Sequence, residues 1–267
     1  MRHFRATVAY DGTAYGGFQI QRTGATIQGE LEAALHRLTQ APVRIAGAGR
    51  TDAGVHAQGQ VITFASDWSH GEATLERAMN AVLPLDISVR EVRAVGERFH
   101  ARFSAVARAY AYAAYAHPIR VPTLDRFAWQ VGQPLDVAAM NRAAQALIGS
   151  HDFAAFGQPP SGDNTVRTVH RACWAIGSAG GHWAVEATEA LYRFDIEANA
   201  FLRGMVRRIV GTLVQVGGKN LSVEAFGEIM ASADISRAGR PAPACGLCLW
   251  RVKYPEDAPA SERQQEE

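Results

Sequence analysis

Apolar residues follow two regular periods in the first hundred residues of the chain. Residues 4–10 place Phe, Ala, Val and Tyr on alternate positions, and this period of two predicts a β-strand. Residues 27–38 place Ile, Leu and Ala at helical spacing behind Thr26, which can cap a helix. The same patterns continue to residue 92 and predict the order β-α-β-loop-β-α-β, with strands over 43–49, 60–66 and 86–92 and a helix over 75–82.

A second series of periods begins near residue 105. Residues 201–217 repeat apolar side chains at i, i+1, i+4 and i+5, which makes them the clearest predicted helix. A predicted β-hairpin joins residues 167–177 to residues 182–188 around the turn SAGG. The other predicted elements are a strand over 108–116, a helix over 136–149 capped by Asp136, a short helix over 226–230 and a last strand from Leu247.

The two series predict an α/β (α+β) protein made of two similar β-sheet halves. Each half is expected to carry helices packed on one face of its sheet, with a groove for the active site between the halves. We place the halves at residues 1–104 and 105–255. The last residues, 256–267, are acidic and show no period, which predicts a disordered tail.

Composition narrows the class of protein. No apolar run approaches the roughly 20 residues of a membrane span, and the first residues lack the apolar core of a signal peptide, so we expect a cytoplasmic protein. Apart from the acidic tail, basic side chains are in modest excess, and all of them except Lys219 and Lys253 are arginines. Arginine pairs with phosphates and stacks on bases, although a GC-rich genome produces the same excess.

The sequence does not favour metal or thiol chemistry. Asp52 and His56 lie four residues apart, but no further His, Cys or carboxylate pair has metal-ligand spacing. Cys245 and Cys248 form a single CGLC pair, and Cys173 is the only other thiol. We expect these cysteines to be small buried residues of a protein from a reducing compartment, with no metal site.

The stretch GAGRTDAGVHAQGQV, residues 47–61, surrounds an Arg-Thr-Asp triplet with glycines. It is not a dinucleotide fingerprint, because Asp52 stands where the third glycine belongs, and it lacks the Gly-Lys-Ser/Thr of a phosphate-binding loop. Glycines let a backbone and its carboxylate approach a substrate closely, which favours Asp52 as a catalytic residue. The alternative is that Asp52 only caps its own turn.

Two further segments carry flat or cationic side chains. On the predicted strand, the period of two puts Arg108, Tyr110 and Tyr112 on one face, which is suited to stacking on a nucleobase, although we expect Tyr112 to belong to the core. On the long predicted helix, Arg203 and Arg207 lie one turn apart at the margin of the apolar stripe. An arginine there can keep a buried carboxylate ionised or can simply be solvated.

Seven segments together resemble the tRNA pseudouridine synthase A family. They are YDGTAYGGFQIQ, TIQGELEAAL, AGAGRTDAGVHAQGQV, FHARFSA, ARAYAY, FLRGMVRRIVGTLVQVG and ACGLCLWRVKYP, in this order and with the expected separations. The resemblance covers residues 4 to about 255, and the block GRTDAGVH is its most specific part.

The resemblance implies the pseudouridine synthase fold and an isomerase without a cofactor. Such an enzyme converts uridine to pseudouridine at positions 38 to 40 in the anticodon stem-loop of tRNA, and it acts as a homodimer whose subunits both contact the tRNA. Asp52 matches the catalytic aspartate of the family. The residues expected at the substrate are Tyr110 stacked on the base, Arg50 beside the flipped nucleotide, Arg207 as partner of the aspartate and Leu247 in an apolar pocket, with Arg108 and Arg203 binding RNA.

The chain departs from the family pattern at several positions, among them Cys245 and Cys248, where glutamate and tyrosine are common, and the short loop GQPPSGDNT. Phe18 stands where tryptophan is common, and Gly204 and Arg208 replace a histidine and an asparagine. Two other classes of protein remain open. A non-catalytic RNA-binding module explains the aromatic strand but gives Asp52 no task, whereas a nucleotide-binding oxidoreductase explains the glycines. An activity assay separates the first from an isomerase, and a bound cofactor absorbing near the visible reveals the second.

Overall fold

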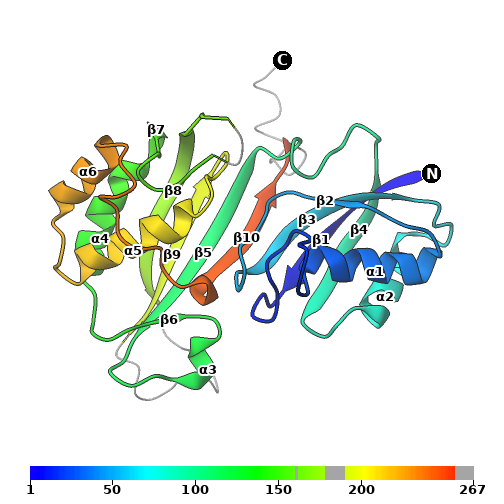
Figure 1. Ribbon diagram of the computed structural model, residues 1–267, viewed down its shortest axis with the longest axis horizontal. Coiled ribbons are helices and arrows are strands. Elements are labelled where there is room, and N and C mark those ends of the chain that lie inside the picture. Colours follow the sequence, from blue (N-terminus) through cyan, green and yellow to red (C-terminus); the bar gives the residue numbers. More distant parts are fainter. Residues whose placement is uncertain (160–161, 178–189, 256–267) are drawn as a thin grey trace. The chain divides into compact units, whose positions relative to one another are not determined.

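A computed structural model describes residues 1–159, 162–177 and 190–255 (Figure 1). The described chain divides into two compact units: unit 1 contains residues 1–108 and 249–255, and unit 2 contains the described residues of Ala109–Cys248. The chain leaves unit 1 within strand β5 (Ala107–Ala116) and returns to it within strand β10 (Leu247–Lys253). The predicted tail, 256–267, and the predicted strand over 182–188 lie outside the described residues.

Unit 1 has the predicted order of elements. β1 pairs antiparallel with β3 and with β4, and the short strand β2 pairs with β3. The two helices contact each other, and α2 packs on β4 (Figure 1). The elements are β1 (Arg2–Tyr10), α1 (Ile27–Thr39), β2 (Ile45–Gly47), β3 (His56–Ser66), α2 (Glu72–Val82) and β4 (Ile87–Val95).

Helix α1 forms where its sequence predicts it. The hydroxyl oxygen of Thr26 accepts a hydrogen bond from the amide of Gly29 at 3.2 Å, which satisfies one of the unpaired donors of the first turn. The apolar stripe predicted on this helix is buried, with Leu31 and Leu35 fully inside unit 1. The cap and the stripe are therefore both confirmed.

The residues of β10 from Leu249 onward belong to unit 1, whereas the sequence places all of this strand in the second half. They run beside β3, where a Cβ atom on Gly59 would lie 2.4 Å from the carbonyl oxygen of Trp250. The amide of Val106 also donates to the carbonyl of Lys253 at 2.9 Å. Close backbone approach and strand pairing thus connect the two ends of unit 1.

Unit 2 contains a sheet in the order β5-β9-β8-β7, with β6 parallel to β5. Helix α4 packs on β8, and α5 and α6 pack on α4 (Figure 1). The carboxylate of Asp136 caps α4 as predicted, accepting from the amide of Ala139 at 2.9 Å. The elements are α3 (Pro122–Asp125), β6 (Trp129–Val131), α4 (Val137–Ala144), η1 (Gln145–Leu147), β7 (Gly149–Asp152), β8 (Val166–Gly177), β9 (Ala190–Ala198), α5 (Met205–Gly217), α6 (Val223–Ala231) and η2 (Ala244–Gly246).

Strand β9 supplies the antiparallel partner of β8 in the described part of the chain. We did not predict this strand, although its sequence carries the signal. Its residues Tyr192, Phe194 and Ile196 are buried and alternate with less buried ones, which is the period of a strand. The α/β (α+β) class is confirmed, and no helix in the described ranges is long and apolar enough to cross a membrane.

Gly227 gives a prediction for the stability of unit 2. It lies inside α6, where a Cβ atom would meet no heavy atom within 4 Å. The Gly227→Ala variant should therefore gain about 0.5–1 kcal/mol of unfolding free energy, because alanine loses less backbone entropy in a helix. Chemical denaturation measures the change. As a control, Gly211→Ala in α5 should be destabilised, since its Cβ would lie 2.0 Å from the carbonyl oxygen of Arg240. Equal stability of the two variants would contradict this account.

Candidate active site

Asp52 lies in the turn between β2 and β3. The amide of Val55 donates to the carbonyl of Asp52 at 3.2 Å and closes the turn, and Gly54 has a φ of 75°, which favours glycine. Thr51 and Val55 are buried, whereas Asp52 between them is half-buried. The turn therefore presents a partly accessible carboxylate on a fixed backbone.

Residues 10–18, which we call the clamp segment, hold this turn from one side. The hydroxyl of Tyr10 and that of Thr51 share a hydrogen bond of 2.8 Å, and Tyr10 is buried. The amide of Phe18 donates to the carbonyl of Thr51 at 3.1 Å. Thr51, the neighbour of Asp52, is thus fixed through both its side chain and its backbone.

Two glycines let the clamp segment approach the Asp52 turn. A Cβ atom on Gly12 would lie 2.1 Å from the carbonyl oxygen of Val55, a separation that real Cβ atoms do not show. Gly17 has a φ of 108°, and a Cβ atom there would lie 2.8 Å from the carbonyl oxygen of Thr51. Side chains at either position would push the turn away from the clamp segment.

His56 joins the clamp segment directly after the turn. It is buried, and its Nδ1 atom lies 3.1 Å from the amide of Gly12, which donates to it, and 3.1 Å from a carboxylate oxygen of Asp11. The same carboxylate accepts from the hydroxyl of Thr13 at 2.6 Å. The sequence suggested His56 only as a metal ligand that lacked partners. The structure gives it a positioning role, for which the segment YDGTAYGGF was the available signal.

Arg50 stands two residues before Asp52 and is exposed. The carbonyl of Gly49, its neighbour, accepts from the side-chain amide of the fully buried Gln60 at 2.8 Å. The backbone that carries Arg50 is therefore anchored, while the guanidinium remains accessible to a ligand.

Arg108 has a structural task that its sequence pattern did not indicate. Its guanidinium donates to three backbone carbonyls of unit 1, those of Ala48 at 3.2 Å, Arg102 at 2.5 Å and Ala105 at 3.2 Å. It thereby ties the loop over 100–105 to the chain that leads into the Asp52 turn. The predicted contact of Arg108 with RNA stays a prediction.

Tyr110 and Tyr112 on β5 differ in burial. Tyr112 is fully buried, and its hydroxyl donates to the carbonyl of Pro243 at 2.9 Å, which confirms its predicted place in the core. Burial raises the pKa of Tyr112. Tyr110 is half-buried, and its ring meets that of Phe201 edge to face at 5.2 Å. Tyr110 therefore combines a supported ring with partial access to solvent.

Arg207 lies on α5 and is half-buried. Its Nε–H donates to the carbonyl of Ala242 at 2.7 Å, and the amide of Ala242 donates back to the carbonyl of Arg207 at 2.9 Å. This reciprocal pair fixes the guanidinium against the loop before β10. Leu247, a few residues further on, begins β10 as predicted and is buried.

Arg203 does not lie on the long helix, contrary to our prediction. Helix α5 begins only at Met205, because Gly204 before it has a left-handed backbone with a φ of 74°. Arg203 is exposed, and its amide donates to the carbonyl of Gln158 at 2.9 Å in an isolated bridge. Arg203 and Arg207 are thus not one helical turn apart, and binding of RNA by Arg203 stays a prediction.

Comparison with known proteins decides the family. The family model described as tRNA pseudouridine synthase matches residues 6–104 and 143–255, which is most of the chain. The chain belongs to the tRNA pseudouridine synthase family. The synthase is therefore an isomerase, and this membership favours catalysis over the alternative of a non-catalytic RNA-binding module.

Named relatives of the synthase match it along almost its whole length. A tRNA pseudouridine synthase A from Roseiflexus castenholzii is 44% identical over 261 residues, 98% of this chain and 94% of that protein. A protein of the same name from Moorella thermoacetica is 42% identical over 255 residues, 94% of this chain and 98% of that protein. One from Aeromonas hydrophila is 43% identical over 251 residues, 94% and 89% of the two chains.

Three of the positions where the synthase departs from the family pattern have local structural explanations. Phe18 is buried, and its ring fills the space beside Gly47, where a Cβ atom would lie 2.5 Å from it. Gly204 supplies the left-handed residue that starts α5. The guanidinium of Arg208 lies 3.5 Å from the carbonyl of Gly239. Each replacement is thus part of the packing of its own unit.

The cysteines of the synthase are free thiols. Cys173, Cys245 and Cys248 are half-buried rather than fully buried. Burial raises the pKa of the Cys245 thiol, and the nearby carboxylate of Asp125 adds to this effect. In the part of the chain that the structure describes, no group of three or more His, Cys, Asp or Glu is placed to hold a metal ion.

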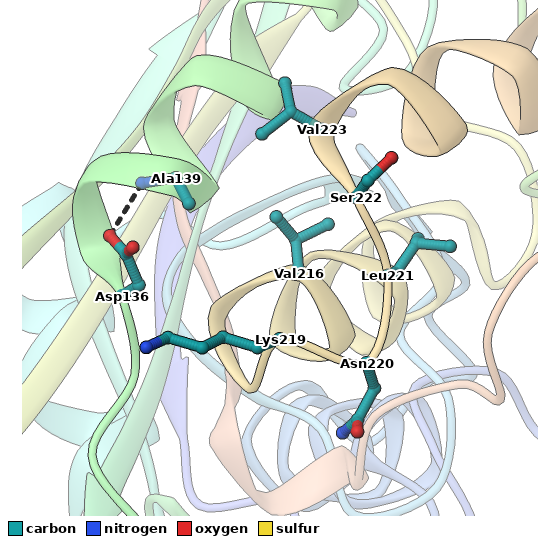
Figure 2. Close-up of a pocket in the computed structure, with 8 residues that line it drawn as sticks. All are labelled: Asp136, Ala139, Val216, Lys219, Asn220, Leu221, Ser222 and Val223. Atoms are coloured by element: carbon teal, nitrogen blue, oxygen red, sulfur yellow. Dashed lines mark hydrogen bonds between the residues drawn. The ribbon is translucent and has the colours of Figure 1, made fainter.

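Unit 2 contains a cavity of about 370 Å³. None of the predicted site residues is among the residues that line it. Figure 2 shows its walls, which come from the start of α4, the end of α5 and the connection into α6. The carboxylate of Asp136 on its rim is engaged as the cap of α4 (Figure 2). The lining residues are Asp136, Ala139, Val216, Lys219, Asn220, Leu221, Ser222 and Val223.

Proposed function

We propose that the chain isomerises uridine to pseudouridine at positions 38 to 40 of the anticodon stem-loop of tRNA, with Asp52 as the catalytic carboxylate. The observation that carries the proposal is the Asp52 turn. A half-buried carboxylate stands between two buried residues, and a second segment of the chain clamps the turn through Thr51 and Val55. Fixed geometry of this kind is what catalysis by a single side chain requires.

The reaction breaks the bond between N1 of uracil and C1′ of the ribose and joins C5 to C1′, with no net gain or loss of atoms. C5 gives up its proton, and N1 gains one. An ionised Asp52 can attack C1′, stabilise a positive centre there, or remove the C2′ proton to give a glycal. In each role it needs a negative charge close to the sugar, which the glycines of its turn permit.

The remaining predicted residues have roles that their surroundings support. A nucleotide must leave its stack to be modified, which costs a few kcal/mol, and Arg50 is exposed to enter the vacated space. Tyr110 covers the base with its half-buried ring, and Leu247 contributes an apolar contact. Arg207, whose guanidinium is oriented by the carbonyl of Ala242, offers a cationic group to the substrate. The proposed enzyme is a cytoplasmic homodimer that works without a cofactor.

Tyr110 gives a prediction that separates stacking from proton transfer. If the ring covers the base, Tyr110→Phe should keep tRNA affinity, whereas Tyr110→Leu should lose about 5- to 100-fold in the modification rate at low tRNA concentration. Initial rates of pseudouridine formation measure both variants. A rate for Tyr110→Leu equal to that of the wild type would argue against stacking. A loss in Phe as large as that in Leu would instead show that the hydroxyl matters, for example as the acceptor of the C5 proton.

Mapping pseudouridines in tRNA after incubation with purified protein tests the proposal. Unmodified tRNA should gain pseudouridine at one or more of positions 38 to 40 and nowhere outside the anticodon stem-loop. A tRNA with cytidine at these positions is the control and should remain unmodified. Pseudouridine at other positions would overturn the proposed location, and binding without any pseudouridine would overturn the proposed activity.

A further inference from the structure

Three residues of unit 1 form an exposed aromatic and cationic surface, which we call the Phe103 platform: His100, Arg102 and Phe103. Phe103 is 76% exposed, more than any other Phe, Tyr or Trp among the described residues. Its ring lies 4.5 Å from the ring of His100, centroid to centroid, and the guanidinium carbon of Arg102 lies 5.5 Å from its centroid. A large apolar ring is thus held in water beside two basic side chains.

Hydrogen bonds keep the platform in one conformation. The amide of His100 donates to the hydroxyl of Ser104 at 3.0 Å, and the amide of Ser104 donates to the carbonyl of His100 at 2.9 Å. Nδ1 of His100 accepts from the amide of Arg102 at 3.1 Å, so a neutral imidazole carries its proton on Nε2. An exposed ring on a closed turn loses little conformational entropy when it binds a ligand.

The inner side of the same segment is anchored in unit 1. Ala101 is fully buried, and its carbonyl accepts from the hydroxyl of Tyr254 at 2.7 Å. Phe99 packs on the ring of Tyr254 at 5.0 Å, and the guanidinium of the buried Arg5 lies 4.7 Å from the same ring. Ala101 and Phe99 therefore anchor the segment to unit 1, whereas Phe103 of the same segment is exposed to solvent.

Arg108 connects the platform to the Asp52 turn. One of its nitrogens donates both to the carbonyl of Arg102 within the platform and to that of Ala48, four residues before Asp52. The platform and the Asp52 turn thus belong to the same unit, and Arg108 bonds both to the platform and to the chain that leads into the turn. A polynucleotide that places one nucleotide at Asp52 would carry its other nucleotides over neighbouring surface of this unit.

We propose that the Phe103 platform binds an unpaired nucleobase of the tRNA substrate by stacking on Phe103, with Arg102 pairing with a phosphate. The inference rests on the proposed function, which supplies the polynucleotide. Aromatic rings accept any base on their faces, and arginine beside them pairs with phosphate. An apolar protein partner fits less well, because it would bury the charge of Arg102 without an anion. Nor is Phe103 a core residue, because three quarters of it is in water.

Affinity measurements on position 103 test the stacking. Phe103→Leu should bind tRNA about 5- to 100-fold more weakly than the wild type, while Phe103→Tyr should bind within about 3-fold of it. Phe127→Leu is the matched control, since Phe127 is an exposed phenylalanine of unit 2 that also lies beside an arginine, Arg126 at 5.9 Å. It should bind like the wild type. An equal loss in Phe127→Leu would overturn the specific role of the platform.

The salt dependence of the same affinities distinguishes stacking from a change of structure. Arg102→Gln should reduce the slope of log affinity against log salt by about 0.7 to 0.9, the value for one lost phosphate contact. Phe103→Leu should leave the slope unchanged and lower the affinity by the same factor at every salt concentration. A variant that alters the fold would change both slope and unfolding midpoint, and that result would count against the proposal.

Failure of the platform and failure of the proposed function give different results. If the wild type binds and modifies tRNA but Phe103→Leu binds it equally well, only the platform is wrong. If the wild type neither binds tRNA nor forms pseudouridine, the proposed function itself is wrong. Binding is measured at equilibrium and modification by pseudouridine mapping, so each claim has its own readout.

Discussion

The Asp52→Asn variant is expected to form pseudouridine at least about 10⁴-fold more slowly than the wild type, with tRNA affinity nearly unchanged. Asparagine has the shape of aspartate, and the backbone contacts of the turn, such as Val55 to the carbonyl of residue 52, do not depend on the side chain. What the variant loses is the negative charge. A neutral amide cannot attack C1′ effectively, stabilise a positive centre there or accept the C2′ proton.

Release of tritium from tRNA labelled at C5 of uridine measures this effect, because C5 loses its hydrogen once it is bonded to C1′. Single turnovers with excess enzyme separate the chemical step from binding. Asp67→Asn is the matched control, since Asp67 is an exposed aspartate of unit 1 whose carboxylate pairs with the N-terminal amine at 3.1 Å. That variant should react like the wild type. Tritium release by Asp52→Asn within tenfold of the wild type would remove Asp52 from the reaction.

The Gly12→Ala variant is expected to show the second largest loss, about 100-fold in the rate of the chemical step. Its Cβ atom would lie 2.1 Å from the carbonyl oxygen of Val55, so the backbone of the Asp52 turn has to move by about 1 Å. Val55 closes this turn through its amide, and the displacement therefore reaches the carboxylate. Single-turnover rates, with tRNA affinity measured in parallel, locate the loss in the chemical step.

Gly96→Ala provides the control for this second variant. Gly96 also lies in unit 1, but a Cβ atom there would meet nothing within 4 Å. Its rate and its unfolding midpoint should equal those of the wild type. A wild-type rate in Gly12→Ala would mean that the turn tolerates displacement, and the clamp segment would then have no part in placing Asp52.

The sequence predicted best what depends on neighbours along the chain. Thr26 and Asp136 cap the helices that follow them, and Leu31 and Leu35 are buried on the predicted stripe. The prediction from sequence was wrong where the backbone conformation of a single residue interrupts an apolar helical period. The apolar pattern of the long helix extends back past Arg203, but the left-handed backbone of Gly204 starts the helix later.

The geometry around Asp52 could not be predicted in the same way, because it arises between distant segments. The bond between Tyr10 and Thr51 joins residues about forty positions apart, and the close approach of Gly12 to Val55 depends on the absence of a side chain. Neither leaves a period in the sequence. Asp52 was predicted as catalytic through its motif, whereas the contact of His56 with the clamp segment and the linking role of Arg108 emerged only from hydrogen bonds in the fold.

The route of the chain through β10 affects how the protein is made on the ribosome. Residues 249–253 of β10 lie beside β3 and contact Gly59 and Val106, so the sheet of unit 1 lacks this strand until these residues are synthesised. While unit 2 is being translated, the edge of β3 that pairs with β10 has no β10 to pair with. Assembly of the unit that carries Asp52 therefore depends on synthesis of residues 249–253, and chains released before residue 249 cannot form its complete sheet.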